Sequence, residues 1–164
     1  MNERIVSDTG PLISLEKMDR GFEFIRQLYE TILVPPAVMV ELAEHFPSPK
    51  AYLQHNKIEN LIQVIPVQVM DALDSNRLHE GEAQAISLAI NQNLSLLIEE
   101  TYGRKIAYSL GLKVSGIARQ IVVAFKKNLI DISDAERRLQ ELLDAHRINQ
   151  RAYDMVREKI NASK

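Results

Sequence analysis

The chain has 164 residues, 46% of them hydrophobic and 26% charged, with no cysteine and no tryptophan. A chain of this length buries roughly 70% of the surface that its unfolded form exposes, so we expect one domain, or one domain with a small appendage. The composition excludes collagen, a disulfide scaffold and intrinsic disorder, and the lack of cysteine excludes thiolate zinc sites, iron–sulfur clusters and a catalytic cysteine. Twenty Lys and Arg against 22 Asp and Glu give a net charge of -2, so no overall basic signature points to nucleic acid.

Nothing in the sequence indicates a targeting segment or a membrane span. The N-terminal residues lead through a short apolar run directly to Asp8, whereas a secretory signal needs a longer apolar region. The longest apolar stretch, Ile32–Val40, contains two prolines and is far shorter than the roughly 20 residues of a membrane-spanning helix. We therefore expect a soluble, cytoplasmic protein without a membrane partner.

Short apolar runs alternate with helix-length amphipathic segments along the chain. The apolar runs predict strands at Arg4–Ser7, Thr31–Val34, Leu61–Ile65, Ser95–Ile98 and Leu112–Val114. Between them, helical periodicity predicts helices over Pro11–Met18, Gly21–Leu28, Pro36–Glu44, Val67–Leu73, Glu82–Ile90, Tyr102–Leu110 and Ile117–Lys127. Most of these strands are almost continuously apolar, as is typical of parallel strands covered on both faces. The alternation predicts an α/β fold with a mainly parallel sheet.

The last part of the chain has a different pattern. Ser133 to Glu136 matches a capping box at a helix start, and an apolar face follows it. A second helix is predicted over about Gln150–Ile160. We therefore predict an α/β domain over residues 1–130 and a helical hairpin over residues 131–164, packed on that domain or on a partner.

Several acidic residues occupy positions that charged side chains normally avoid. Asp8 directly follows the first predicted strand, and Glu99 and Glu100 follow the fourth. Ligands of open parallel sheets bind beyond the carboxyl ends of the strands. Glu41 lies in a helix that is apolar nearly all round, and Glu82 opens a helix on the same face as its apolar residues.

Each acid also has an ordinary structural interpretation. Asp8 could cap the following helix, Glu82 could favour the helix dipole, Glu41 could pair with one base, and Glu99 and Glu100 could be solvated. Taken together, however, clustered carboxylates repel one another unless something neutralises them. Hard oxygen ligands suit Mg²⁺ or Mn²⁺, and such sites hydrolyse phosphodiesters in two-metal nucleases.

Other catalytic motifs fit the sequence less well. Asp8-Thr9-Gly10 matches the D-T-G of aspartic proteases, but those enzymes need two such aspartates on an all-β scaffold. Only a dimeric protease with one copy per chain stays open. The chain lacks a G-x-x-x-x-G-K-[ST] or G-x-G-x-x-G phosphate-binding loop, and its four histidines lack zinc-ligand spacing.

A set of blocks occurs in a characteristic order and spacing: Ile5–Ile13, Val34–Leu42, Gly81–Ile86, Leu96–Glu100 and Gly103–Ala107. This ordered set resembles the PIN domain family, the fold of VapC-type toxin ribonucleases and related metal-dependent nucleases. The resemblance covers about Arg4 to Ile130, and Leu110–Gly116 also fits an uncharacterised bacterial and archaeal branch of the family.

The resemblance implies a three-layer α/β/α sandwich with a central, mainly parallel five-stranded sheet. It also implies an acidic pocket for Mg²⁺ or Mn²⁺ and endonucleolytic cleavage of RNA. Position by position, Asp8, Glu41 and Glu82 match the first three family acids, and Glu100, or Glu99 one residue earlier, matches the fourth.

The chain departs from the family pattern at two places. Glu99-Glu100 stands where the branch usually has Asp-Asp, and the longer side chain would shift the carboxylate by about 1 Å, which can cost about 10²-fold in rate. A weak or inactive module that binds RNA or protein is therefore the alternative function. Gly10 stands where a small hydroxyl residue is common, which leaves Thr9 or Ser14 as substitutes for its contact to substrate.

The sequence thus predicts a metal-dependent endoribonuclease. Asp8, Glu41, Glu82 and Glu100 would hold the metal directly or through water, with Glu99 as a further ligand. Arg104 and Lys105 follow the acid pair and are candidates for contacts to backbone phosphates. The resemblance further suggests a homodimer and the toxin component of a toxin–antitoxin pair, with an antitoxin protein as partner.

Overall fold

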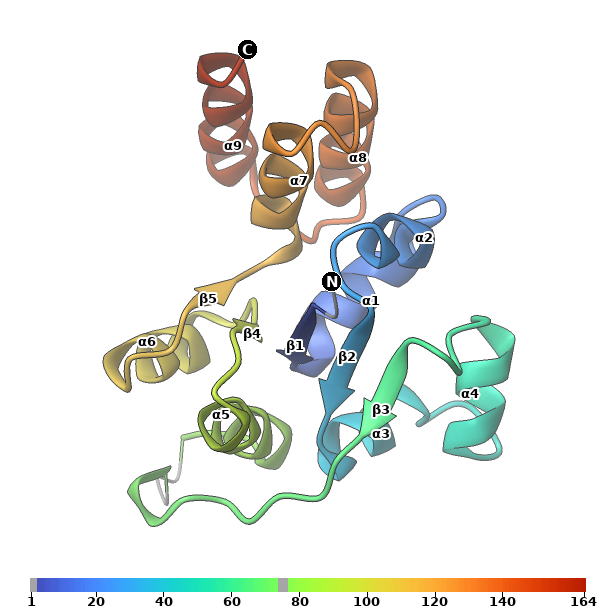
Figure 1. Cartoon of the computed structure of the whole chain (residues 1–164), viewed down its shortest axis with the longest axis vertical. Coiled ribbons are helices and arrows are strands. Elements are labelled where there is room, and N and C mark those ends of the chain that lie inside the picture. Colours follow the sequence, from blue (N-terminus) through green and yellow to red (C-terminus); the bar gives the residue numbers. More distant parts are fainter. Residues whose placement is uncertain (1–2, 74–76) are drawn as a thin grey trace. The chain divides into compact units, whose positions relative to one another are not determined.

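A computed structural model describes residues 3–73 and 77–164 of the chain (Figure 1). The described strands are β1 (Arg4–Ser7), β2 (Thr31–Val34), β3 (Ile62–Val64), β4 (Leu96–Leu97) and β5 (Val114–Ser115). They form one five-stranded sheet in the order β3-β2-β1-β4-β5, and all neighbouring strands are parallel. The predicted α/β class with a central, parallel, five-stranded sheet is therefore confirmed.

The first strand of the sequence lies at the centre of the sheet. Ile5 pairs with Ile32 of β2 on one side, and Val6 pairs with Leu96 of β4 on the other. These side chains are at most 2% exposed. Burial on both faces explains why the strands are apolar almost without alternation, and it places the residue after β1 at the middle of the carboxyl edge.

The chain divides into two compact units, which we describe separately. The first contains the sheet and spans residues up to Ile13 together with Tyr29–Ser115, and the second comprises Ser14–Leu28 and Gly116–Lys164. Helix α1 (Thr9–Lys17) contributes residues to both. The first unit also holds α3 (Pro36–Leu42), α4 (Pro49–His55), the 3₁₀ turn η1 (Asp71–Leu73), α5 (Glu80–Gln92) and α6 (Thr101–Ser109).

Helices α3, α5 and α6 carry site residues and are fixed to the sheet or to one another. Helix α5 packs against β1, β4 and α3, and α6 packs against β5. Pro36 occupies the first turn of α3, where a missing N–H costs little. The N–H of Ala37 donates to Oε1 of Gln84 at 3.0 Å, which ties the start of α3 to α5.

The second unit is helical and includes the predicted hairpin. Its elements besides the end of α1 are α2 (Gly21–Arg26), α7 (Ile117–Lys126), α8 (Ile132–Asp144) and α9 (Gln150–Ala162). Helices α8 and α9 pack on each other and on α7. The hairpin thus packs on its own chain, whereas the predicted domain boundary at residue 130 stays a prediction.

Three local expectations differ from the structure. No helix forms over residues 67–70, and only η1 appears within the expected Val67–Leu73. Helix α4, which the periodicity did not indicate, begins after Ser48, whose hydroxyl accepts a hydrogen bond from Ala51 N–H at 3.1 Å. The cap of α8 is Asp131 rather than Ser133, because the Asp131 carboxylate accepts from Asp134 N–H at 2.7 Å. Within the described residues, no helix is long and apolar enough to cross a membrane.

Candidate functional site

Two acidic segments meet at the carboxyl edge of the sheet. Asp8 follows β1, and its N–H donates to the carbonyl of Leu97 at 2.9 Å, so it lies beside the end of β4. Glu99 and Glu100 come one and two residues after the buried Ile98. The parallel pairing of β1 and β4 therefore brings these acids together, as the sequence predicted. Asp8 is 6% exposed, Glu99 is half-buried and Glu100 is exposed.

Glu41 reaches this edge from α3. Glu41 is an exposed residue, although the apolar sequence around it indicated a buried position. Its carboxylate nevertheless has a buried partner, because the hydroxyl of Thr9 donates to Oε2 of Glu41 at 3.1 Å. Thr9 therefore binds one of the acids, and its hydroxyl is directed to Glu41 rather than left for a substrate.

Glu82 is the most enclosed acid of the group. It is 6% exposed, and the N–H of His79, the residue before α5, donates to its Oε1 at 3.4 Å. Its other oxygen, Oε2, is completely buried and has no hydrogen-bond partner. Among the described residues, this is the one buried side-chain polar atom that is left unsatisfied. Such an atom normally needs an explanation, and a bound ion is one of the usual ones.

The electrostatics show that these carboxyl groups lie close together. Burial, with the charges of Glu41, Glu100 and Glu99, raises the pKa of Asp8 to about 6 against the lowering effect of the Thr9 N–H. Burial, the hydrogen bond that a protonated Glu82 makes with the Glu100 carboxylate, and the charge of Asp8 raise the pKa of Glu82 to about 7. The N–H of Gly103 donates to Oε2 of Glu100 at 2.6 Å and lowers the pKa of that group. Glu82 is therefore the member of the pair that binds a proton more readily.

These residues suit a divalent cation without forming a finished cage. In the described part of the chain, no three Asp, Glu or His side chains stand together as a ready ligand set. Thr9 holds Glu41 and the Gly103 N–H holds Glu100, while like charges keep ionised carboxylates apart. The orphaned Glu82 oxygen and the all-oxygen donors fit Mg²⁺ or Mn²⁺. Gly81 and Gly103 also fit, since they leave open the space into which the carboxylates reach.

The other predicted site residues have different surroundings. Ser14 is completely buried, and its hydroxyl accepts a hydrogen bond from Nε of Arg147 at 2.9 Å, while its contact to substrate stays a prediction. Arg104 and Lys105 lie on α6, directly after the acidic edge, half-buried and exposed respectively. Their part in phosphate binding stays a prediction.

Two residues near the acids were missed in the sequence. The Arg77 guanidinium lies 5.9 Å from the ring centre of Tyr102, at cation–π distance. Tyr102 belongs to the first turn of α6, between Glu100 and Gly103, and Arg77 precedes α5. A guanidinium beside an aromatic ring suits contacts to the phosphate and the nucleobase of a nucleic acid. Nothing in the sequence around these two residues distinguishes them from ordinary surface residues.

The comparisons identify the family. A family model described as a PIN domain matches residues 4–162, nearly the whole chain and including the C-terminal hairpin. The chain therefore belongs to the PIN domain family, whose members are generally nucleases that use divalent metal ions. A search of the curated proteins found no match.

Two solved structures resemble the chain. One is a PilT N-terminus domain protein from the hyperthermophilic archaeon Sulfolobus solfataricus P2, with 16% identity and a TM-score of 0.53 over 71% of this chain and 88% of that one. At this identity the likeness shows the fold alone, which is the expected α/β/α architecture. The other is a domain of a functionally unknown protein from Methanocaldococcus jannaschii, with 20% identity, a TM-score of 0.44, and coverage of 70% and 90%.

Proposed function

We propose that the protein is a divalent-metal-dependent endoribonuclease whose Mg²⁺ or Mn²⁺ is held by Asp8, Glu41, Glu82 and Glu100, with Glu99 as a further ligand. The observation that carries the proposal is the buried, unpaired Oε2 of Glu82, which lies beside Glu100 and within the field of Asp8. An unsatisfied carboxylate oxygen away from water is costly, and a cation bound at this position would remove the cost.

The chain's own residues prepare the site for this chemistry. A metal held by these acids would activate a water molecule and offset charge on the scissile phosphate. Thr9 orients Glu41, the His79 N–H orients Glu82, and the Gly103 N–H orients Glu100. Arg104 and Lys105 on α6, with Arg77 and Tyr102 beside them, provide groups for the RNA backbone and bases.

The test is cleavage of a mixed RNA pool with Mn²⁺, by the wild-type protein and by Asp8→Asn and Glu82→Gln. We expect both variants to lose at least about 10²-fold in rate, because each removes a negatively charged ligand. Glu80→Gln is the matched control, since Glu80 lies in the same helical turn but bonds Gln84 instead of the cluster. Equal rates for wild type and Asp8→Asn would refute the assignment of Asp8.

Glu99-Glu100 favours a second candidate function, a PIN module that binds RNA or protein but cleaves weakly or not at all. Glu100 places one oxygen on the Gly103 N–H and caps α6, which occupies part of its ligand capacity. A calorimetric and thermal-shift titration with Mn²⁺ separates the two candidates. No response at millimolar Mn²⁺ would favour the binding module over the nuclease.

The biological setting belongs to the same proposal. We place the protein in the cytoplasm as the toxin component of a toxin–antitoxin pair, acting as a homodimer and inhibited by an antitoxin protein. Membership of the PIN domain family supports this role. A small gene for a DNA-binding protein directly upstream, whose product relieves growth arrest caused by this chain, is the expected observation.

A further inference from the structure

Two glycines adjoin the acidic cluster in positions where their backbone does not require glycine. Gly81 lies in the first turn of α5 and Gly103 in the first turn of α6, and both are buried. Both residues are helical, and neither has a positive φ. Glycine is a poorer helix former than alanine, so backbone geometry alone favours alanine at both sites.

The carboxylates of the cluster explain both glycines. An alanine Cβ at position 103 would lie 2.6 Å from Oε2 of Glu82, the buried and unpaired oxygen, and 3.3 Å from Oε2 of Glu100. It would also lie 2.8 Å from Cδ1 of Ile98. An alanine Cβ at position 81 would overlap Oε1 of Glu41 at a separation below 3.0 Å, which real Cβ contacts essentially never show.

The atoms that a new Cβ would meet are ends of flexible side chains and not backbone. A methyl group at position 81 can therefore be accommodated by moving the Glu41 carboxylate, whereas at position 103 the end of the buried Ile98 side chain has to move as well as a carboxylate. Gly21 in α2 provides the contrast, because a Cβ there would strike the backbone carbonyl of Leu15. Gly21 is thus needed for backbone packing, whereas Gly81 and Gly103 leave room for the carboxylates of neighbouring acids.

We propose that Gly81 and Gly103 are positioning residues of the metal site: Gly81 sets the place of the Glu41 carboxylate, and Gly103 sets that of the Glu82 and Glu100 carboxylates. This inference rests on the proposed function, since it concerns the same acids. The two glycines act on different ligands. Each alone therefore affects metal binding, and Gly103, which adjoins two carboxylates including the orphaned one, has the larger effect.

The experiment compares Gly81→Ala, Gly103→Ala and Gly21→Ala in the full chain. Mn²⁺ affinity is measured by the loss of the free-ion electron paramagnetic resonance signal, and thermal midpoints are measured without metal. We expect Gly81→Ala and Gly103→Ala to keep or raise the metal-free midpoint and to weaken Mn²⁺ binding about 10- to 100-fold, the range typical of residues that orient ligands. Gly21→Ala is expected to lower the midpoint and to leave the Mn²⁺ affinity of the folded protein unchanged.

A rescue variant distinguishes positioning from a general disturbance. Glu82→Asp shortens the side chain by one methylene, which returns the space that the new methyl group takes. We therefore expect the double variant Gly103→Ala/Glu82→Asp to bind Mn²⁺ more tightly than the two single effects predict. Wild-type affinity in both glycine variants, or a loss of fold in both, would overturn the proposal. Failure of the wild-type protein itself to bind Mn²⁺ would overturn the proposed function instead.

Discussion

Glu82 combines two demands that conflict at neutral pH. Its Oε1 accepts a hydrogen bond at the start of α5, which favours the charged form, while its Oε2 is buried without a partner beside another carboxyl. The pKa of about 7 means that the protonated and ionised forms of this group are both populated near neutral pH. A cation and this proton therefore compete for the same buried oxygen.

The pKa shifts predict how the metal-free protein responds to pH. Because the pKa values of Asp8 and Glu82 are raised in the folded state, that state binds more protons than the unfolded chain between about pH 4 and pH 7. The contribution of these two groups to stability is complete below pH 4 and is lost as the pH rises through 6 and 7. At pH 8, Glu82→Gln should therefore be more stable than wild type by about 1–2 kcal/mol.

Urea unfolding of wild type and Glu82→Gln at pH 5 and pH 8, without metal, checks this expectation. The advantage of the variant should shrink at pH 5, where Glu82 is protonated in the wild type. Glu80→Gln serves as the control for an amide substitution in the same helical turn. A difference that is the same at both pH values would contradict the assignment of a raised pKa to Glu82.

At this scale the sequence revealed the acids but not their surroundings. Asp8 and Glu82 were found because each charge interrupts an apolar pattern, which is visible in the residues alone. The partner of Ser14, the distance from Arg77 to Tyr102 and the space beside Gly103 depend on contacts between distant segments. No local pattern encodes such distances, so these features required the fold.

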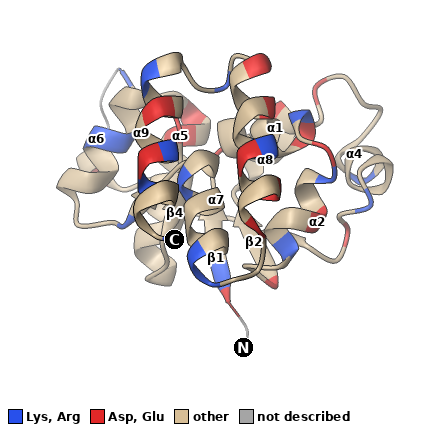
Figure 2. Cartoon of the chain, turned by 90° about the horizontal axis from the view of Figure 1, so that it is seen from above, with Lys and Arg blue, Asp and Glu red and all other residues tan. Residues whose placement is uncertain are grey.

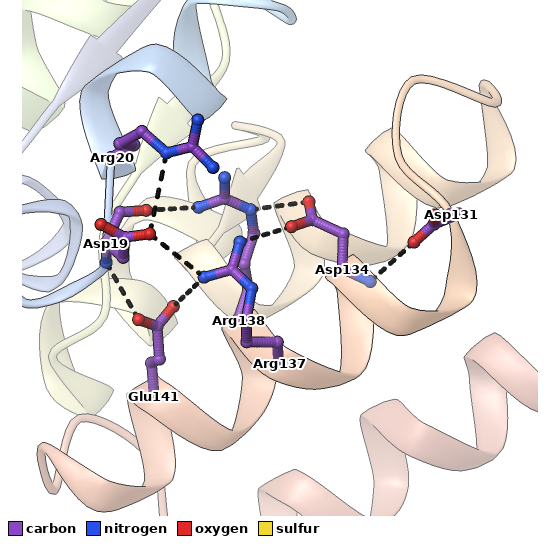
Figure 3. A network of polar contacts seen from close by, with 7 residues as sticks. All are labelled: Asp19, Arg20, Asp131, Asp134, Arg137, Arg138 and Glu141. Atoms are coloured by element: carbon purple, nitrogen blue, oxygen red, sulfur yellow. Dashed lines mark hydrogen bonds and ion pairs between the residues drawn. The ribbon is translucent and has the colours of Figure 1, made fainter.

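At the scale of elements, helix α8 is fastened to the turn between α1 and α2 by a polar network (Figure 3). Arg138 is 5% exposed, and its guanidinium bonds Asp134 at 2.9 Å and the carbonyl of Asp19 at 3.0 Å. It also lies 4.8 Å from the ring centre of Phe24. Although burial opposes ionisation, the hydrogen bonds from Arg138 and Arg137 lower the pKa of Asp134.

Neighbouring arginines in this network should differ in their contribution to stability. Arg138→Ala leaves Asp134 and the Asp19 carbonyl without their buried partner, and we expect it to lower the free energy of unfolding by about 3 kcal/mol. Arg137→Ala removes a side chain that is 40% exposed, and we expect a loss below about 1 kcal/mol. Guanidinium chloride unfolding of both variants measures the difference, and equal losses would contradict the buried role of Arg138.

Elements were predicted correctly where a buried segment has an apolar sequence. Strands β1 and β2 were predicted at their observed bounds because they are apolar runs enclosed on both faces. The segment at Val67–Leu73 is apolar enough for a helix, but residues 67–70 form none, and Met70 N–H donates to Oγ of Ser87 in α5 instead. Helix α4 has no clear apolar periodicity, but its start could have been recognised from the N-cap Ser48 followed by Pro49.

For the whole molecule, the near-neutral charge limits how the proposed nuclease would bind RNA. Basic and acidic residues are mixed along α8 and α9, without a continuous basic stripe on these helices (Figure 2). Affinity for RNA should therefore depend on the cation that neutralises the acidic cluster. We expect the wild-type protein to bind a single-stranded RNA probe weakly in EDTA and at least about tenfold more tightly with Mn²⁺. Fluorescence anisotropy measures both affinities. Asp8→Asn, which lacks one of the proposed ligands, is the comparison protein.

The outcome would be read from the difference between the two proteins. Asp8→Asn should show little gain in affinity with Mn²⁺, and raising the salt concentration should weaken the metal-free binding of both proteins equally. A wild-type affinity that is independent of Mn²⁺ would contradict a cation-mediated contact.

The fold class and the sheet were predictable at this scale because strands and helices alternate along the sequence. The two compact units were not predictable, since one of them joins two segments that are distant in the sequence.

The central position of β1 has a consequence for the timing of activity. Val6 of β1 can pair with Leu96 of β4 only after residue 96 has been synthesised. The site therefore depends on contacts between segments that are distant in the sequence. Until then Asp8 has no Glu100 beside it, because a growing chain that ends before Leu96 contains Asp8, Glu41 and Glu82 but neither Glu99 nor Glu100. The proposed metal site therefore cannot be complete before Glu100 has been synthesised and β4 has joined β1 in the sheet.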